Sequence, residues 1–278
     1  MIENINWYPG HMKKTREMIQ ENLKMVDLVI EVIDSRIPVS SRNPIIDELI
    51  KGKKRIIILN KSDLADKTED KKWADHFHEE GNEVLMMNCM LGDGTKQLFK
   101  MLSKEQEQKN AEKARKKPLR MMIVGVPNVG KSSLINRMTG KKSTKTGDRP
   151  GVTKGKQWLT LTNGMQLLDT PGILWPKFED PEVGLNLAFC GSIKDEILDT
   201  ATLAMELIGV LQEKYPELLK ARYKLDELCE TPLETMEAIA LARGFILPGK
   251  RVDYERTART VLDEFRSGKI GHITLERL

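Results

Sequence analysis

The chain has 278 residues, of which 40% are hydrophobic and 31% are charged, and its formal net charge is +4. This apolar content is enough for one large core or two modest ones, and we expect two domains. No apolar run approaches the roughly 18 residues of a membrane-spanning helix, and the amino terminus lacks the apolar segment of a signal peptide. These features exclude a helical membrane protein and predict a cytoplasmic protein with no membrane partner.

Charge is distributed unevenly along the chain. Residues 1–178 carry a net charge of +10, whereas residues 179–278 carry −6. A basic surface attracts polyanions without reading their sequence, so the first part indicates either a nucleic-acid partner or an ordinary solvated surface. Cys89, Cys190 and Cys229 are far apart and are not spaced as zinc ligands, which predicts reduced thiols.

The first part of the chain alternates between helical and strand patterns. An amphipathic helix is expected over residues 12–25 and a shorter helix near residues 44–51. Short apolar runs typical of buried parallel strands occupy residues 28–34, 55–60, 83–88 and 119–125. This alternation predicts a doubly wound, mostly parallel sheet, and therefore an α/β fold. Residues 103–118 have almost no apolar face and end at a proline, which predicts a solvated helix or a linker.

The pattern changes after residue 156. Residues 157–162 and 165–170 read as the two strands of a β-hairpin around Asn163-Gly164. Strand signals disappear after Pro176. Helical periodicity occupies residues 197–215, 231–244 and 251–268. The last hundred residues are therefore expected to form an all-α domain.

Residues 125–132 carry a phosphate-binding signature. They read GVPNVGKS, which fits G-x-x-x-x-G-K-[ST], and they stand between a predicted strand and a predicted helix. Glycines in such a loop let backbone N–H groups converge on phosphates, a lysine supplies charge to the β and γ groups, and a hydroxyl binds Mg²⁺. The alternative is a tight turn with no ligand. The candidate phosphate-binding residues are Asn128, Val129, Gly130, Lys131, Ser132 and Ser133, with Ser132 also a Mg²⁺ ligand.

A phosphate loop does not identify the base, but the tetrapeptide Asn60-Lys61-Ser62-Asp63 can, the alternative being an ordinary turn after a strand. A carboxylate at Asp63 can accept two hydrogen bonds from the N1–H and N2–H₂ edge of guanine, and adenine offers no such pair of donors. The candidate guanine-binding residues here are Asn60, Lys61 and Asp63. Asn88 and Cys89 follow the predicted strand over 83–88, and the backbone N–H of Cys89 is the expected second contact to the base. An ATPase is the alternative to this prediction.

Two further segments complete a nucleotide-switch pattern. Residues 169–172 read DTPG at the end of the second hairpin strand. Asp169 is expected to hold Mg²⁺ through water, and the Gly172 N–H to touch the γ-phosphate. The loop upstream supplies Thr153 as the candidate for a second hydroxyl on Mg²⁺, with Thr146 as the competing choice.

These four elements are those of a GTPase, but their order is permuted, because the base-recognition motif precedes the phosphate loop. Binding requires only that each loop lie at the carboxyl edge of the same sheet. Joining the original termini through residues 103–118 would produce this order without moving any loop in space. The sequence therefore predicts a circularly permuted P-loop GTPase domain.

The chain resembles the circularly permuted GTPases, and specifically the ribosome biogenesis GTPase A family. The matching blocks are WYPGHMKK at 7–14, DSRIPVSSRNP at 34–44, LNKSD at 59–63, GVPNVGKSSLINR at 125–137, KTGDRPGVTKGKQW at 145–158 and LLDTPGILWPKFED at 167–180. The resemblance implies a GTPase that acts late in maturation of the large ribosomal subunit and is stimulated by that subunit. The sequence pattern predicts a GTPase domain over residues 1–178 and a helical domain over 179–278, and the resemblance implies that the helical domain binds RNA or the ribosome. We expect a monomer.

The hydrolytic residue is not evident from the switch motif. The position after DTPG is Ile173, whose side chain cannot orient a water molecule as the glutamine of Ras-like enzymes does. The resemblance implies that His11 takes this role beside Lys131, and that Asn128 helps to hold K⁺ against the phosphates. Arg36 is a rival source of positive charge, or it belongs to a turn fixed by Asp34.

Two hypotheses about the whole protein remain at this point. In the first, a GTP-dependent clamp presents two basic surfaces to ribosomal RNA, drawn from residues 103–120, the amino-terminal helix and residues 243–269. The basic side chains of the last segment are Arg243, Lys250, Arg251, Arg256 and Arg259. In the second, the chain is an RNA-binding scaffold that needs GTP only for folding and whose turnover is incidental.

Overall fold

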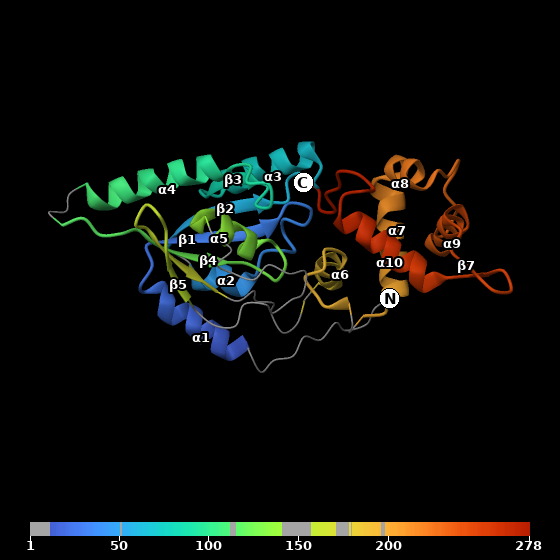
Figure 1. Cartoon of the computed structure of the whole chain (residues 1–278), viewed down its shortest axis with the longest axis horizontal. Coiled ribbons are helices and arrows are strands. Elements are labelled where there is room, and N and C mark those ends of the chain that lie inside the picture. The colour runs from blue at the N-terminus through green and yellow to red at the C-terminus, as the bar shows by residue number, and fades with distance from the viewer. Residues whose placement is uncertain are drawn as a thin grey trace.

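The computed structural model describes residues 12–50, 52–111, 115–140, 157–170, 178, 180–195 and 198–278. A six-stranded sheet dominates the first part of the chain, in the order β3-β2-β1-β4-β6-β5 (Figure 1). Its strands are β1 (Leu28–Asp34), β2 (Lys54–Asn60), β3 (Glu83–Met87), β4 (Arg120–Val124), β5 (Gln157–Thr160) and β6 (Gln166–Asp169). All neighbours are parallel except β5, which pairs with β6 in a hairpin. The predicted mostly parallel, doubly wound sheet is thus confirmed.

Helices cover both faces of this sheet. They are α1 (Met12–Leu23), α2 (Pro44–Leu49), α3 (Lys67–Glu79), α4 (Thr95–Asn110) and α5 (Lys131–Thr139). Alternate residues of β1 face opposite sides, so Ile30 and Val32 join a cluster with α4 and α5, whereas Val29 and Ile33 pack toward α1, α2 and α3. Both faces are therefore apolar, which is why the strands appear in the sequence as continuous hydrophobic runs.

The second part of the chain is mainly helical. Its elements are α6 (Pro181–Phe189), α7 (Thr200–Lys214), α8 (Pro216–Tyr223), α9 (Pro232–Arg243), β7 (Ile246–Leu247), β8 (Arg251–Val252) and α10 (Tyr254–Arg266). The short β7–β8 ribbon corrects the expectation of an all-α domain. It turns through Gly249 and Lys250, both at positive φ. None of the described helices is long and apolar enough to span a membrane.

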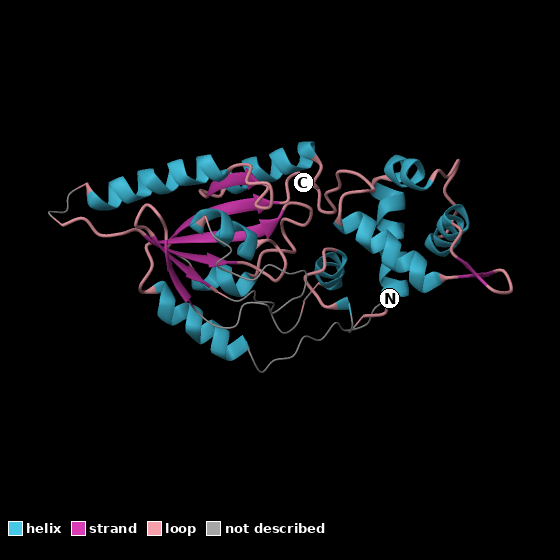
Figure 2. Ribbon diagram, viewed as in Figure 1, coloured by secondary structure: helices cyan, strands magenta, loops and turns pink. Residues whose placement is uncertain are grey.

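The register of the sheet places the ends of its strands together. Asp34 at the end of β1 pairs with Asn60 at the end of β2, and Asn60 pairs with Met87 at the end of β3. The loops that follow these strands therefore begin side by side at the carboxyl edge. Figure 2 shows the arrowheads of β1 and β2 pointing toward the helical part of the molecule. The two parts meet at this edge.

Candidate functional site

The phosphate loop occupies the connection between β4 and α5. Gly125 has a φ of +149° and Gly130 a φ of +104°. A Cβ atom on Gly125 would lie 2.3 Å from the carbonyl oxygen of Val32, and one on Gly130 would lie 2.1 Å from Nδ2 of Asn60. Glycine is therefore required at both positions for two reasons. The backbone has a positive φ, and atoms of β1 and β2 lie too close to leave room for a side chain.

Asn60 joins three loops that are remote in the sequence. Its Nδ2 donates a hydrogen bond of 2.6 Å to the carbonyl of Val129 in the phosphate loop. Its Oδ1 accepts a hydrogen bond of 2.9 Å from the backbone N–H of Cys89. The side chain is only 3% exposed, so both bonds are shielded from water. The structure thus brings the base-recognition motif, the phosphate loop and the loop after β3 into one site.

Lys131 is the first residue of α5 and is folded back over the phosphate loop. Its Nζ donates to the carbonyl of Gly125 at 3.0 Å and to that of Val126 at 2.6 Å. Gly130, at the N-cap of α5, has no side chain to cap the helix. A cation and the positive end of a helix dipole therefore lie together within the loop, which favours an anion such as phosphate. Ser132 and Ser133 occupy the first turn of the same helix.

The base-recognition loop is fixed on both sides of Asp63. The backbone N–H and the hydroxyl of Ser62 both donate to the carbonyl of Met87, at 3.3 and 3.1 Å. The N–H of Leu64 donates to the carbonyl of Lys61 at 2.8 Å. Asp63 itself is exposed. Its carboxylate is accessible to a ligand, while its neighbours are held in place.

Lys61 has a different setting from the one the motif alone suggests. It adopts a positive φ of 61°, and its Nζ forms an ion pair of 2.8 Å with Asp34. Arg36 binds the same carboxylate through Nε at 2.9 Å and Nη2 at 2.8 Å. Burial alone would raise the pKa of Asp34, but the adjacent Arg36 and Lys61 cations outweigh burial and hold that pKa well below its ordinary range.

Arg36 is 1% exposed and stacks on Phe265 of α10, with its Cζ atom 5.2 Å from the ring centroid. A guanidinium enclosed and paired in this way does not extend toward the phosphate loop. The geometry therefore favours the interpretation of Arg36 as part of a strand-end turn over its interpretation as a mobile catalytic cation.

The loop after β3 carries Asn88 and Cys89, and both residues form hydrogen bonds within the site. Oδ1 of Asn88 accepts from the N–H groups of Met90 and Leu91 at 3.0 and 2.9 Å, so the residue shapes a turn. The backbone N–H of Cys89, which we expected to contact the base, donates to Asn60. This bond satisfies the buried amide oxygen of Asn60, and the contact of Cys89 with the base stays a prediction. The three cysteines are free, as expected, and burial raises the pKa of both Cys89 and Cys190 to about 12.

Asn128 connects the phosphate loop with the helical part of the chain. It has a positive φ of 60°, and its Nδ2 donates to the carbonyl of Gly191 at 2.7 Å. The neighbouring carbonyl of Pro127 accepts from the hydroxyl of Ser192 at 2.8 Å. Because K⁺ takes oxygen ligands, only Oδ1 of Asn128 is suited to hold such an ion. The contact with residues 191–192 has no signal in the sequence.

Several predicted site residues lie outside the part that the structure describes. They are His11, Thr146, Thr153, Gly172 and Ile173, together with the side chain of Asp169. The backbone of Asp169 is described, and it pairs with Ile123 of β4 immediately before the phosphate loop. Ser132 follows the phosphate loop in the first turn of α5, and Asp169 ends β6, the strand beside β4. A hydroxyl with a carboxylate is a donor set that suits Mg²⁺. Among the described residues, no group of three or more His, Cys, Asp or Glu side chains could hold a metal.

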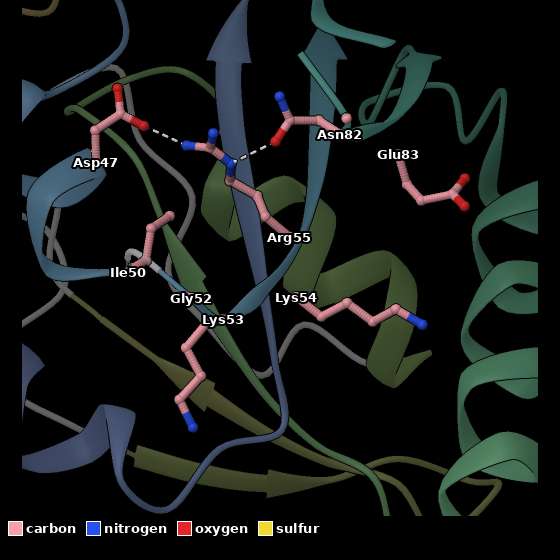
Figure 3. A pocket seen from close by; sticks show the side chains of 9 residues that line it. Asp47, Ile50, Gly52, Lys53, Lys54, Arg55, Asn82 and Glu83 are labelled. Carbon is pink, nitrogen blue, oxygen red and sulfur yellow. Dashed lines mark hydrogen bonds and ion pairs between the residues drawn. The ribbon is translucent and has the colours of Figure 1, made fainter. Parts of the chain in front are cut away.

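A pocket of about 400 Å³ lies at the opposite edge of the sheet (Figure 3). It is lined by the starts of β2 and β3, where Lys54 and Glu83 stand. The Arg55 side chain in it donates to Asn82 at 2.9 Å and pairs with Asp47. The pocket is therefore remote from the loops of the candidate site, and its arginine is already satisfied by protein groups.

Comparisons with known proteins agree with this geometry. A family model described as 50S ribosome-binding GTPase matches residues 120–233. A ribosome biogenesis GTPase A of Bacillus cereus is 48% identical, covering 98% of this chain and 93% of that protein. A mitochondrial ribosome-associated GTPase 1 of Mus musculus is 36% identical, covering 98% of this chain and 90% of that protein.

Solved structures show the same arrangement over nearly the whole length. The GNP-bound structure of YlqF from Thermotoga maritima is similar with a TM-score of 0.68 and 31% identity, covering 95% of this chain and 98% of that one. Its GDP-bound structure gives the same TM-score and identity. With the permuted motifs converging on Asn60, and with relatives of this identity along the full chain, the protein belongs to the ribosome biogenesis GTPase A family.

Proposed function

We propose that this protein binds GTP, hydrolyses it to GDP and phosphate, and uses this cycle in late maturation of the large ribosomal subunit. The observation that carries the first part is the Asn60 side chain, which ties the NKSD segment to the phosphate loop although 69 residues separate Asn60 from Val129. The family and the names of its relatives support the second part. We further propose that the chain works as a cytoplasmic monomer, with a GTPase domain over residues 1–178 and an RNA-binding domain over 179–278.

The proposed roles follow from the chemistry of each group. Asp63 accepts the guanine edge, with Asn60 and Lys61 maintaining the loop. Lys131 exchanges its two backbone carbonyl partners for the β- and γ-phosphates. Ser132, Thr153 and Asp169 would hold Mg²⁺, which neutralises phosphate charge when bound. Gly172 would contact the γ-phosphate, so that its loop responds to hydrolysis.

Water activation requires a group from outside the DTPG segment, because Ile173 has no hydrogen-bonding side chain. We propose His11 for this role, since an imidazole can accept a proton near neutral pH. A K⁺ ion on Oδ1 of Asn128 would supply diffuse positive charge at the phosphates. His11→Ala is expected to lower turnover stimulated by large subunits by about 100-fold, a loss typical of a general base, without weakening GDP binding. Stimulation that survives in this variant would remove His11 from the mechanism.

Base recognition is tested by replacing the Asp63 carboxylate with an amide, which has different hydrogen-bonding groups. In Asp63→Asn the amide can accept from xanthine N1–H and donate to the xanthine C2 carbonyl, but it cannot accept two hydrogen bonds from guanine. We expect GDP affinity to fall about 100-fold, from the loss of a charge-assisted pair, while affinity for xanthosine diphosphate rises. ADP should compete with labelled GDP for the unaltered protein only at far higher concentration. Equal competition by ADP would contradict guanine recognition.

A surface for RNA is supported by the β7–β8 ribbon. Lys250 and Arg251 are exposed at its turn, and the Arg256 guanidinium lies 4.4 Å from the Phe245 ring centroid beside it. Arg243 contributes less to this surface, because it pairs with Glu264 at 3.3 Å. The double variant Lys250→Glu/Arg251→Glu should reduce co-sedimentation with large subunits by at least about tenfold and flatten its salt dependence. The GTP-dependent scaffold predicts the same binding loss, but no turnover stimulated by subunits in the unaltered protein.

A further inference from the structure

The carboxyl-terminal segment returns from α10 to the sheet and runs along the loops after β1 and β2. We call residues 273–276 the strap. The N–H of Ile273 donates to the carbonyl of Leu64 at 2.9 Å, and the N–H of Leu275 donates to the carbonyl of Arg36 at 2.8 Å. Oγ1 of Thr274 accepts from the N–H of Asp66 at 3.1 Å. Ile273 and Thr274 therefore bind the loop that carries Asp63, and Leu275 binds the loop after β1.

The opposite side of the strap is held by the helical part of the chain. The N–H of Thr274 donates to the hydroxyl of Tyr215 at 3.1 Å, and that hydroxyl donates to the carbonyl of Thr274 at 3.0 Å. Nζ of Lys214 donates to the carbonyl of Leu275 at 2.5 Å. Thr274 is 0% exposed, so its hydrogen bonds are formed without competition from water. The strap thus connects the end of α7 directly with the base-recognition loop.

Glu276 anchors the end of the strap. Its carboxylate accepts from the N–H groups of Val39 and Ser40 at 2.5 and 2.9 Å, in the loop after β1. Its carbonyl accepts from the indole N–H of Trp73 in α3 at 2.9 Å. Two loops of the sheet and one helix are therefore attached to the same few residues, and the strap cannot shift without disturbing them.

Asp63 lies between two fixed points. Ser62 is bonded to the end of β3, and Leu64 is bonded to the strap. The Leu64 side chain also fills the space beside Gly268, where an added Cβ would lie 2.7 Å from it. The strap and Gly268 both belong to the helical part of the chain, and of the two the strap holds the loop through hydrogen bonds. Loss of its hold on Leu64 and Asp66 would free one side of the loop.

We propose that the strap is a positioning element for guanine recognition, with Thr274 as its central positioning residue. This inference rests on the proposed binding of GTP through Asp63. The helical part would then hold the Asp63 carboxylate in position to bind guanine, in addition to any contact that it makes with RNA. Because coupling between two equilibria is reciprocal, bound nucleotide must also favour docking of the strap.

The test compares GDP with inosine diphosphate, which lacks the 2-amino group and so uses only one of the two hydrogen bonds to Asp63. The ratio of the two dissociation constants reports how well the carboxylate is placed. Thr274→Val keeps the shape of the side chain and removes the acceptor for Asp66. We expect GDP binding to weaken about tenfold and inosine diphosphate binding about twofold, since the value of one hydrogen bond is at stake. Thr274→Ser restores the hydroxyl and should restore the ratio.

Thr257→Val is the matched control. Thr257 is also 0% exposed, but its hydroxyl donates within α10 to the carbonyl of Asp253 at 2.7 Å, and it has no hydrogen-bond partner among the described residues of the sheet part. This variant should leave the ratio unchanged even if it lowers stability. Equal weakening of both nucleotides in Thr274→Val, or no weakening, would overturn the inference while leaving guanine binding intact. If the unaltered protein does not prefer GDP to ADP, the proposed function fails first.

A measurement on the unaltered protein applies even if Thr274→Val does not fold. Hydrogen exchange at the amides of Ile273 and Leu275, whose N–H groups bind the two loops, should slow by about tenfold when GDP is added, which corresponds to a modest coupling between sites. Amides of the β7–β8 ribbon serve as the internal reference and should not change. Exchange of the strap that ignores GDP would contradict the coupling.

Discussion

At the scale of single residues, Asn60 explains why two other positions are restricted. It fills the space that a side chain on Gly130 would need, and it uses the backbone N–H of Cys89 as its donor. Asn60, Gly130 and Cys89 therefore depend on one another through direct contacts, in addition to any ligand that they share. A change at any of these positions should act on nucleotide binding through the others.

Asn60→Ala should weaken GDP binding by about 30-fold, because two buried hydrogen bonds of roughly 1 kcal/mol each are lost and two loops are released. Titration of a fluorescent GDP analogue measures the effect. Asn82→Ala is the control, since Asn82 also bonds through its amide, to Arg55 and to the Phe77 carbonyl, but at the opposite edge of the sheet. A similar loss of affinity in both variants would indicate general destabilisation rather than a local role.

Asp70 in α3 predicts a specific dependence of stability on pH. Burial raises its pKa to about 7 from 3.8, with Asp34 and Asp66 adding to the effect. Between these values the folded chain retains a proton that the unfolded chain has released. The contribution of Asp70 to the free energy of unfolding is therefore most favourable below about pH 4, and it becomes unfavourable as the pH rises toward 7.

Asp70→Asn should be more stable than the unaltered protein at pH 7.5 by roughly 1–3 kcal/mol, and the difference should vanish near pH 4. Urea unfolding across this range provides the free energies. Asp75→Asn, an exposed position on the same helix, should show no such convergence. A pH-independent gain in Asp70→Asn would show that helix propensity, not ionisation, is responsible.

At the scale of elements, apolar strands were predictable and polar helix contacts were not. The strand over residues 28–34 was predicted with its observed bounds, because both of its faces are buried. Residues 103–110, by contrast, continue α4 despite their lack of an apolar face. Glu105 pairs there with Lys54 at 2.6 Å, and Gln106 accepts from the N–H of Leu119 at 2.6 Å. Such partners are distant in the chain, so periodicity does not reveal them.

Arg266→Lys tests one element contact that the sequence did not suggest. Arg266 of α10 donates to the carbonyls of Phe189 and Ala188 at 2.9 Å each, at the end of α6, and pairs with Asp195 at 2.7 Å. Lysine keeps the charge but not the planar fork. Amides of residues 190–192 should exchange about tenfold faster, since roughly one hydrogen bond's net stability is lost. Arg259→Lys, 73% exposed on the same helix, should have no effect.

At the scale of the whole molecule, the nucleotide motifs could be predicted from the sequence because each combines residue types in a fixed order. The contacts between the two parts could not. Gly191, Thr274 and Glu276 belong to no motif, and they act through backbone groups or through partners far away in the chain. The base-recognition loop and the phosphate loop are each held by the helical part. The helical part therefore helps to maintain the geometry of the nucleotide site itself.

Arg36 is a buried side chain that contacts both parts of the chain, and its removal tests whether it joins them through charge or through packing. It neutralises Asp34 of β1, stacks on Phe265 and donates to the Arg266 carbonyl at 3.4 Å. Arg36→Met should lower the free energy of unfolding by about 3–5 kcal/mol, because Asp34 then stays buried with one cation, Lys61.

Adding Asp34→Asn removes the uncompensated charge, so the double variant should be more stable than Arg36→Met alone. Urea unfolding of the two single variants and the double variant provides this cycle. Arg42→Met is the comparison, since Arg42 stacks on Phe77 at 4.9 Å within the sheet part and does not reach α10. If the double variant is less stable than Arg36→Met, the stability lost in Arg36→Met comes from lost packing against α10 and not from the buried carboxylate. Arg36 would then join the two parts by its shape rather than by its charge.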